Sequence, residues 1–80
     1  MKLEIITPDD RVYQGEVTSV IVPGSNGQFQ ILVNHAPIIS SLSEGKVEVK
    51  TSDGEDKTFD VRGGVIEVLN NKIILLAESV

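Results

Sequence analysis

The sequence contains no cysteine and only one histidine among its 80 residues, and these absences narrow the kind of protein it encodes. Without cysteine the chain has neither disulfides nor thiolate metal sites, a composition typical of a reducing compartment. The single histidine, His35, cannot build a histidine-rich metal site. A domain of this length buries only about 60% of the surface that its unfolded chain exposes, so it is marginally stable alone. Its stability must therefore come from sheet packing, from a partner, or from both.

Positive charge is also scarce, since seven basic residues stand against twelve acidic ones and the net charge is −5. The basic residues are scattered singly along the chain: Lys2, Arg11, Lys46, Lys50, Lys57, Arg62 and Lys72. Nucleic-acid binding needs clustered basic side chains that displace counterions from phosphate. Two phenylalanines and one tyrosine also give few surfaces on which bases could stack. The sequence therefore argues against a nucleic-acid partner.

Long hydrophobic runs are missing as well. No apolar stretch approaches the roughly 18 to 20 residues that a membrane-spanning helix needs. The first ten residues, MKLEIITPDD, carry acidic residues and proline where a signal peptide would have its apolar stretch. We expect a soluble and cytosolic chain, or at least one that is not secreted.

The sequence does contain stretches in which apolar and polar residues alternate, as in β-strands, and turn residues separate these stretches. Ser52-Asp53-Gly54 and Asn70-Asn71 indicate hairpin turns, because glycine and asparagine adopt the positive φ that tight turns require. Gly63-Gly64 indicates a sharp chain reversal or a bulge. No sustained period of 3.6 residues is present, and turn signals recur about every 8 to 12 residues. The pattern predicts one all-β domain over residues 1–80, an antiparallel sandwich or flattened barrel of roughly eight to ten short strands.

The segment PGSNGQFQILVNHAPII, residues 23–39, contains His35 but no catalytic motif around it. A general base needs an orienting partner, and none is evident, so an imidazole held by a loop hydrogen bond is the first interpretation and an interface contact the second. Gly24 and Gly27 lead into a strand rather than into a helix that begins with Lys-Ser or Lys-Thr, so they form a turn and not a phosphate-binding loop. The stretch APIIS that follows would mark a partner surface if Ile38 and Ile39 are exposed, although alternation places at least one of them in the core.

Two other binding functions stay open at this point. A biotinyl or lipoyl carrier places a modified lysine at a hairpin tip, and Lys72 beside the expected turn resembles that position but lacks the usual Met-Lys-Met or Asp-Lys-Ala context. A free-standing β-sandwich module for a peptide or glycan would need an exposed aromatic platform. Tyr13, Phe29 and Phe59 are few for that purpose.

The segment VPGSNGQFQILVNHAPI resembles the signature loop of the epsilon subunit of F-type ATP synthase, in which a Pro-Gly turn leads through a short strand to His-Ala-Pro. Segments on both sides are similar to the same family, so the resemblance covers the whole chain: LEIITPDDRVYQGEVTSVIVPG, GKVEVK, VRGGVIEV and NKIILLAES. The chain departs from the family pattern at Gln30, where glycine is usual, and at Gln28, often a glutamate. Val33-Asn34 replace a common Pro-Gly before the histidine, and Ser43-Glu44 replace a frequent Lys-Pro.

The resemblance implies an all-β, two-sheet antiparallel β-sandwich of about ten short strands, without the C-terminal helical hairpin that inhibits hydrolysis or binds ATP in longer members. It implies a non-catalytic rotor subunit without cofactor or metal, which couples ion-driven rotation to ATP synthesis. Its location would be peripheral, at the cytoplasmic face of the bacterial inner membrane, and its partners the gamma subunit and the c-ring. By the same resemblance the c-ring contact comprises Gln28, Asn34 and His35, and the gamma contact comprises Thr7, Pro37, Ile38, Ile39 and Leu42.

Overall fold

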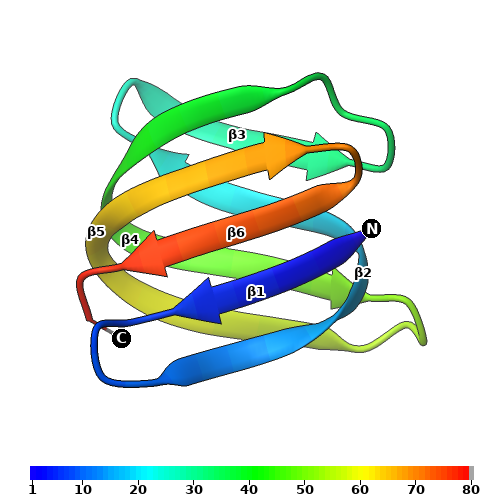
Figure 1. The fold of residues 1–80 in the computed structure, drawn as a ribbon, viewed down its shortest axis with the longest axis horizontal. Helices are drawn as coiled ribbons and strands as arrows, with labels where there is room; N and C mark the ends of the chain where they lie inside the picture. Colours follow the sequence, from blue (N-terminus) through cyan, green and yellow to red (C-terminus); the bar gives the residue numbers. More distant parts are fainter. Residues whose placement is uncertain (80) are drawn as a thin grey trace.

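The computed structural model describes residues 1–79, and the regular structure in that range consists of strands alone (Figure 1). The six strands are β1 (Lys2–Ile6), β2 (Arg11–Gly24), β3 (Gly27–Leu32), β4 (Ile38–Thr51), β5 (Asp56–Leu69) and β6 (Lys72–Ala77). Over the same residues there is no helix with the length and apolar character needed to cross a membrane. The prediction of an all-β fold is confirmed.

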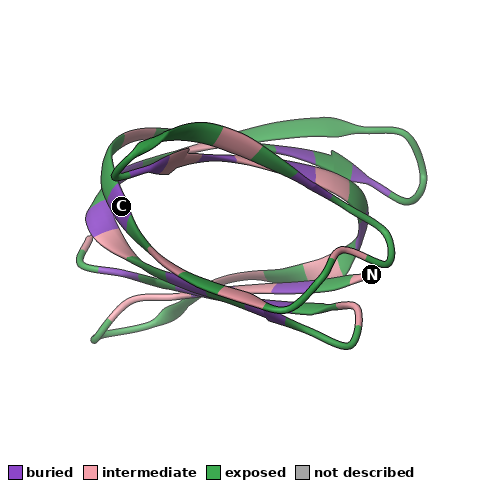
Figure 2. Cartoon of the chain, turned by 90° about the horizontal axis from the view of Figure 1, so that it is seen from above, coloured by how far each residue is buried: buried purple, intermediate pink, exposed green. Residues whose placement is uncertain are grey.

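The strands form a single sheet that closes on itself. Their order is β1-β6-β5-β4-β2-β3, and β1 also pairs with β2, which completes the ring and leaves β3 as an edge strand beside β2. All pairings are antiparallel except that of β1 with β6, which is parallel. Seen from above, the closed sheet is flattened into two facing layers (Figure 2). The flattened-barrel form of the prediction therefore describes the molecule better than two separate sheets do.

The number of strands differs from the expected ten because three long strands bend where the sequence indicates interruptions. β2, β4 and β5 each contain 14 residues. Gly63-Gly64 lies inside β5, which keeps one register with β4 from Ile38↔Val68 to Lys50↔Asp56, so the expected reversal or bulge was wrong. Strands continue through their glycines because the neighbouring strand continues to supply hydrogen-bond partners on both sides.

The closest backbone approach lies at this bend in β5. Gly64 has a φ of 147° and Gly63 a φ of 119°. A Cβ on Gly64 would collide with the carbonyl oxygen of Leu76 in β6, and a Cβ on Gly63 would lie 2.9 Å from Oε2 of Glu78. Glycine is therefore required at position 64 both by conformation and by space.

The core is an aliphatic cluster between the two layers. Inward and outward side chains alternate along each strand, as the pattern in β4 and β6 illustrates. The buried apolar residues are Leu3, Ile5, Val17, Val20, Val22, Ile31, Leu42, Val47, Val49, Val61, Ile66, Val68, Ile73, Leu75 and Ala77. At the rim of the core the rings of Tyr13 and Phe59 pack with centroids 5.5 Å apart. Every strand thus contributes to the core, and only the outer face of the sheet is available for contact with other molecules.

Candidate interaction surfaces

The loop of residues 33–37, between β3 and β4, is organised by hydrogen bonds of His35. Its backbone N–H donates to the carbonyl of Leu32 (3.1 Å). Its ring Nδ1 lies 2.7 Å from the carbonyl oxygen of Ala36, and because a carbonyl only accepts, Nδ1 carries the proton. The side chain is half-buried, and the interpretation of an imidazole held by a loop hydrogen bond is confirmed.

The same loop is attached to the turn between β5 and β6 by two asparagines. The backbone N–H of Asn34 donates to Oδ1 of Asn71 (2.6 Å), and Nδ2 of Asn71 donates to Oδ1 of Asn34 (2.9 Å). Both residues have positive φ, 66° and 61° respectively, a region that asparagine and glycine tolerate best. Asn34 thus has a conformation that glycine also adopts readily, and its side chain connects the loop to Asn71, 37 residues away in the sequence.

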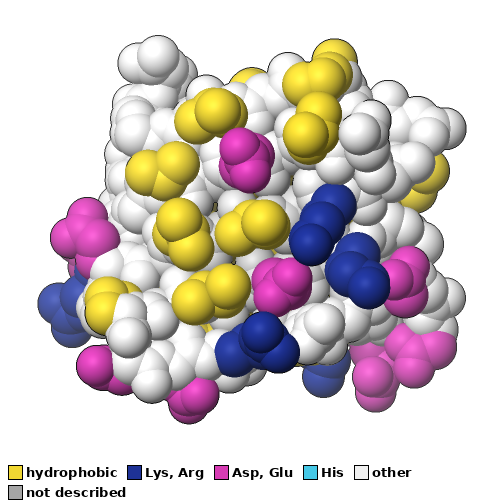
Figure 3. Space-filling model, in the orientation of Figure 1, with side chains coloured by type: hydrophobic (Ala, Val, Ile, Leu, Met, Phe, Trp, Pro, Cys, Tyr) yellow, Lys and Arg dark blue, Asp and Glu magenta, His cyan; other side chains and the backbone are white. Residues whose placement is uncertain are grey.

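A second feature is an apolar patch on the outer side of β4, β5, β6 and β1, here called the apolar face. Figure 3 shows its hydrophobic side chains gathered over the strands that face the viewer, around two acidic side chains and next to a group of basic ones. Its members are the outward-pointing apolar residues of these strands: Ile6, Ile39, Val65, Leu69, Ile74 and Leu76. Ile39 is 71% exposed, and Leu69 and Leu76 are each 51% exposed. Contiguous exposed apolar surface of this kind usually marks an interaction site.

Strand register explains why these residues form one patch. Residues paired across neighbouring strands point to the same side of a sheet. Glu67 on β5 is paired with Ile39 on β4 and with Ile74 on β6. Two residues away along β5, Val65 is paired with Leu76 on β6. Residues that lie far apart in the sequence therefore form a continuous surface.

The gamma-contact residues expected from the sequence are distributed around the apolar face. Ile39 belongs to it, exposed Pro37 adjoins it, and Thr7 borders it beyond the end of β1. Ile38 is half-buried and packs against the core, and Leu42 is only 6% exposed. Leu42 therefore cannot present its side chain to a partner and stabilises the sheet beneath the apolar face instead.

The expected c-ring residues do not form one cluster. Gln28 lies near the start of β3, and Asn34 and His35 lie beyond its end. With a rise of about 3.3 Å per residue, the strand from Gln28 to Leu32 spans about 13 Å, and Asn34 and His35 lie in the turn beyond it. Two exposed apolar residues lie between Gln28 and Asn34 in the sequence: Leu32, the last residue of β3, and Val33, the first residue of the loop. A single partner that touches all three polar residues would have to extend along the edge of β3.

Most residues of the apolar face were not predicted from the sequence. The outward residues Val65, Leu69, Ile74 and Leu76, and Glu67 among them, were not among the expected contacts. One signal was present: KIILLA is apolar at consecutive positions, so both faces of that strand are apolar although only one can point into the core. Exposed glutamate within an alternating strand gives no comparable signal.

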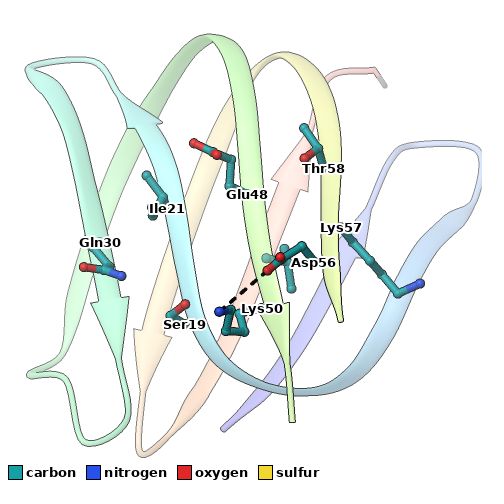
Figure 4. A pocket seen from close by; sticks show the side chains of 9 residues that line it. Ser19, Ile21, Gln30, Glu48, Lys50, Asp56, Lys57 and Thr58 are labelled. Atoms are coloured by element: carbon teal, nitrogen blue, oxygen red, sulfur yellow. Dashed lines mark ion pairs between the residues drawn. The ribbon is translucent and has the colours of Figure 1, made fainter. Parts of the chain in front are cut away.

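A shallow polar hollow lies on the outer side of β2, β3, β4 and the first half of β5, away from the apolar face. Figure 4 shows the polar and charged side chains that line it, with Ile21 among them and an ion pair between Lys50 and Asp56 (3.9 Å). Its charges of opposite sign lie side by side on neighbouring strands. No group of three or more potential metal ligands occurs within residues 1–79.

The two alternative binding functions find little support in the geometry. Nζ of Lys72 lies 3.8 Å from Oε1 of Glu4, so this lysine is paired on the wall of the sheet. Tyr13, Phe29 and Phe59 are all half-buried and packed against the core. These three aromatic residues therefore form no exposed platform.

The fold and its surfaces define a class of protein: a small closed β domain whose outer wall carries an apolar face, suited to assembly with other chains. The chain belongs to the family described as ATP synthase, Delta/Epsilon chain, beta-sandwich domain, whose family model matches residues 1–80. The resemblance found in the sequence is thereby confirmed.

Relatives support the same assignment. The chain is 49% identical over 79 residues to the ATP synthase epsilon chain of Chlorobium limicola, covering 99% of this chain and 90% of that one. It is 41% identical over 78 residues to the ATP synthase epsilon chain of Leptospira interrogans, covering 98% of this chain and 61% of that one. The length of relatives therefore varies, and the shared part is the β domain.

Solved structures show the same fold at low sequence identity. A chain in the Euglena gracilis mitochondrial ATP synthase, OSCP/F1/c-ring, superposes with a TM-score of 0.90 at 19% identity, covering 96% of this chain and 49% of that chain. A chain in the central stalk/c-ring of the Tetrahymena thermophila enzyme gives a TM-score of 0.80 at 16% identity, covering 96% and 62% respectively. At such identities the likeness concerns the fold alone.

Proposed function

We propose that this chain is the epsilon subunit of an F-type ATP synthase and acts in its central stalk, where it binds the gamma subunit and contacts the c-ring. It couples ion-driven rotation to ATP synthesis without catalysing a reaction itself. It is held at the cytoplasmic face of the bacterial inner membrane only through the complex. The observation that carries the proposal is the apolar face, which is large and continuous on a chain whose family assembles into ATP synthase.

The gamma subunit is the partner proposed for the apolar face. Central contacts would come from Ile39 together with the outward residues of β5 and β6, and Pro37 and Thr7 would contribute at the rim. Burial of these side chains gives about 25 cal/mol for each Å² of apolar surface removed from water. The closed sheet below them is a stiff support, because every strand pairs on at least one side and five strands form a ring.

The c-ring is the partner proposed for β3 and the loop that follows it. Gln28, Asn34 and His35 are polar groups at the two ends of this edge strand. Polar loops of a ring could hydrogen-bond to these side chains while the Asn34–Asn71 connection keeps the loop in place. Two separate surfaces would then allow the domain to bind gamma and the ring at once.

The test is calorimetric titration of this chain into the purified gamma subunit of the same organism. We expect saturable one-to-one binding by the wild-type chain. Ile39→Lys should reduce affinity by at least about tenfold, because it places a charge in the most exposed part of the apolar face. Circular dichroism should show an unchanged fold, since this side chain is 71% exposed.

A matched control is Leu32→Lys, which places the same charge on an exposed apolar residue of β3 outside the apolar face. This variant should bind gamma as the wild type does. Equal loss in both variants would contradict the assignment of the gamma contact, and absence of binding by the folded wild-type chain would contradict the proposed function.

A further inference from the structure

Glu67 is an acidic residue whose register places it in the middle of the apolar face, between strands β4 and β6. It is directly opposite Ile39 on β4 and Ile74 on β6, and its same-side neighbours along β5 are Val65 and Leu69. Apolar residues thus surround its carboxylate on four sides of the sheet surface. Within residues 1–79 the side chain of Glu67 has neither an ion-pair partner nor a hydrogen-bond donor.

The contrast with Glu4, the other carboxylate on this wall, shows how unusual that is. Glu4 receives Nε of Arg11 at 3.6 Å and Nζ of Lys72 at 3.8 Å, and its side chain is only 13% exposed. Lys72, the basic residue on the strand next to Glu67, is therefore already engaged with Glu4. The carboxylate of Glu67 is therefore free to pair with a cation of another molecule.

A shallow pocket adjoins this carboxylate. Its lining comes from the end of the loop before β4, the start of β4 and the end of β5: Pro37, Ile38, Ile39, Glu67, Val68 and Leu69. The walls are almost entirely apolar, and Glu67 supplies the only charge in the lining. Apolar walls with one carboxylate match a side chain that has a long aliphatic stem and a positive end.

Covering the apolar face with a partner would take the Glu67 carboxylate out of water. A carboxylate that is desolvated without a cation or several donors is strongly unfavourable. The partner must therefore bring a positive group to this point, or the apolar contact around it cannot form. Arginine fits best, because its planar fork donates two hydrogen bonds to one carboxylate and its stem packs on apolar surface.

We propose that the pocket beside Glu67 receives an arginine side chain of the partner protein and that this pair selects the partner for the apolar face. The proposal rests on the proposed function, by which the partner is the gamma subunit. A protein with an apolar surface but no cation at this point would bind weakly, because the Glu67 carboxylate would be buried without a partner. Glu67 therefore contributes specificity, and the apolar residues contribute affinity.

The test compares the dissociation constants of Glu67→Gln and Glu67→Lys with that of the wild type for the purified gamma subunit, by calorimetry at several salt concentrations. Glu67→Gln keeps the shape and should raise Kd by about tenfold, and Glu67→Lys should raise it further through repulsion. The affinity of Glu67→Gln should also depend less on salt than that of the wild type. Glu48→Gln, an exposed glutamate on the outer side of β4 near the polar hollow, is the control and should leave both quantities unchanged.

Each outcome decides between the two proposals. Wild-type binding together with unchanged affinity in both folded Glu67 variants would overturn the arginine pair and leave the proposed function intact. No binding by the folded wild-type chain would overturn the proposed function and the pair with it. A loss of affinity in Glu67→Gln with an unchanged salt dependence would show a packing effect and would also overturn the ion pair.

Discussion

At the scale of single residues, two asparagines hold the loop of residues 33–37 in place through hydrogen bonds of their side chains. Asn34 and Asn71 both have positive φ and each accepts a hydrogen bond from the other residue. His35 uses its ring to fix the following peptide. The loop is therefore shaped by side chains on its own residues and held in place by a turn distant in the sequence.

The amide of Asn71 should contribute measurably to stability. Asn71→Gly keeps the positive φ accessible and removes both hydrogen bonds, so the free energy of unfolding should fall by about 1 kcal/mol. Asn71→Ala should lose about 1 kcal/mol more, because alanine is strained at positive φ. Urea unfolding measures both. Asn70→Gly is the control, since Asn70 has a φ of 51° and its side chain is outside this pair, and it should change stability little.

The histidine loop shows what a sequence can predict at this scale. A single imidazole without an orienting partner indicated a structural hydrogen bond, and the ring contact with Ala36 is of that kind. The pairing of Asn34 with Asn71 could not be predicted, because it depends on the loop and the turn meeting in the closed sheet, 37 residues apart. The roles of Gln28, Asn34 and His35 toward a partner stay predictions.

At the scale of elements, the long strands β2, β4 and β5 determine the architecture. Each is one continuous strand that curves around the barrel (Figure 1). The bend in β5 depends on Gly64, whose missing Cβ leaves room for the carbonyl of Leu76. The sheet can close at this bend because Gly64 has no side chain.

Gly64→Ala should consequently be among the most destabilising single substitutions in the chain. We expect a loss of about 3 kcal/mol or more, because a methyl group here collides with backbone, which cannot move aside as a side chain can. Gly54→Ala is the matched control: its φ is 90°, but nothing lies within 4 Å of the added Cβ, so only about 1 kcal/mol of conformational strain is expected. Thermal unfolding followed by circular dichroism distinguishes them, and equal losses would contradict a steric cause.

The strands themselves were predictable from alternation, but their number was not. Along β4, for example, Val47 and Val49 alternate with charged residues and are buried. Gly63-Gly64 looked like an interruption because local sequence cannot show that β4 runs alongside and pairs with β5 through the bend. The apolar face escaped prediction for a related reason, since a residue such as Leu76 looks equally suited to a core and to a partner surface.

At the scale of the whole molecule, a chain of 80 residues combines an aliphatic core with an apolar face on the outside of the same sheet. The core stabilises the isolated chain. The side chains of the apolar face are buried only when a partner binds, so their burial adds stability only in the complex. A domain of this size is marginally stable, so its partner should affect stability strongly.

Binding of gamma should therefore raise the melting temperature of this chain. At a free gamma concentration about 100 times Kd, mass action adds about 2.7 kcal/mol to the free energy of unfolding. For a domain of this length that corresponds to an increase of roughly 10 to 20 °C. Differential scanning calorimetry with Ile39→Lys under the same conditions is the control, and an equal increase in that variant would contradict stabilisation through the apolar face.

The parallel pairing of β1 with β6 has a consequence for how the chain acquires its structure. β1 has β6 as its second neighbour, so the ring remains open until β6 has been synthesised. Pairings between segments so far apart are slow to form, with folding on the order of milliseconds to seconds. During synthesis the hairpin of β4 and β5 can assemble as it emerges, whereas β1 stays half-paired until residues 72–76 reach it.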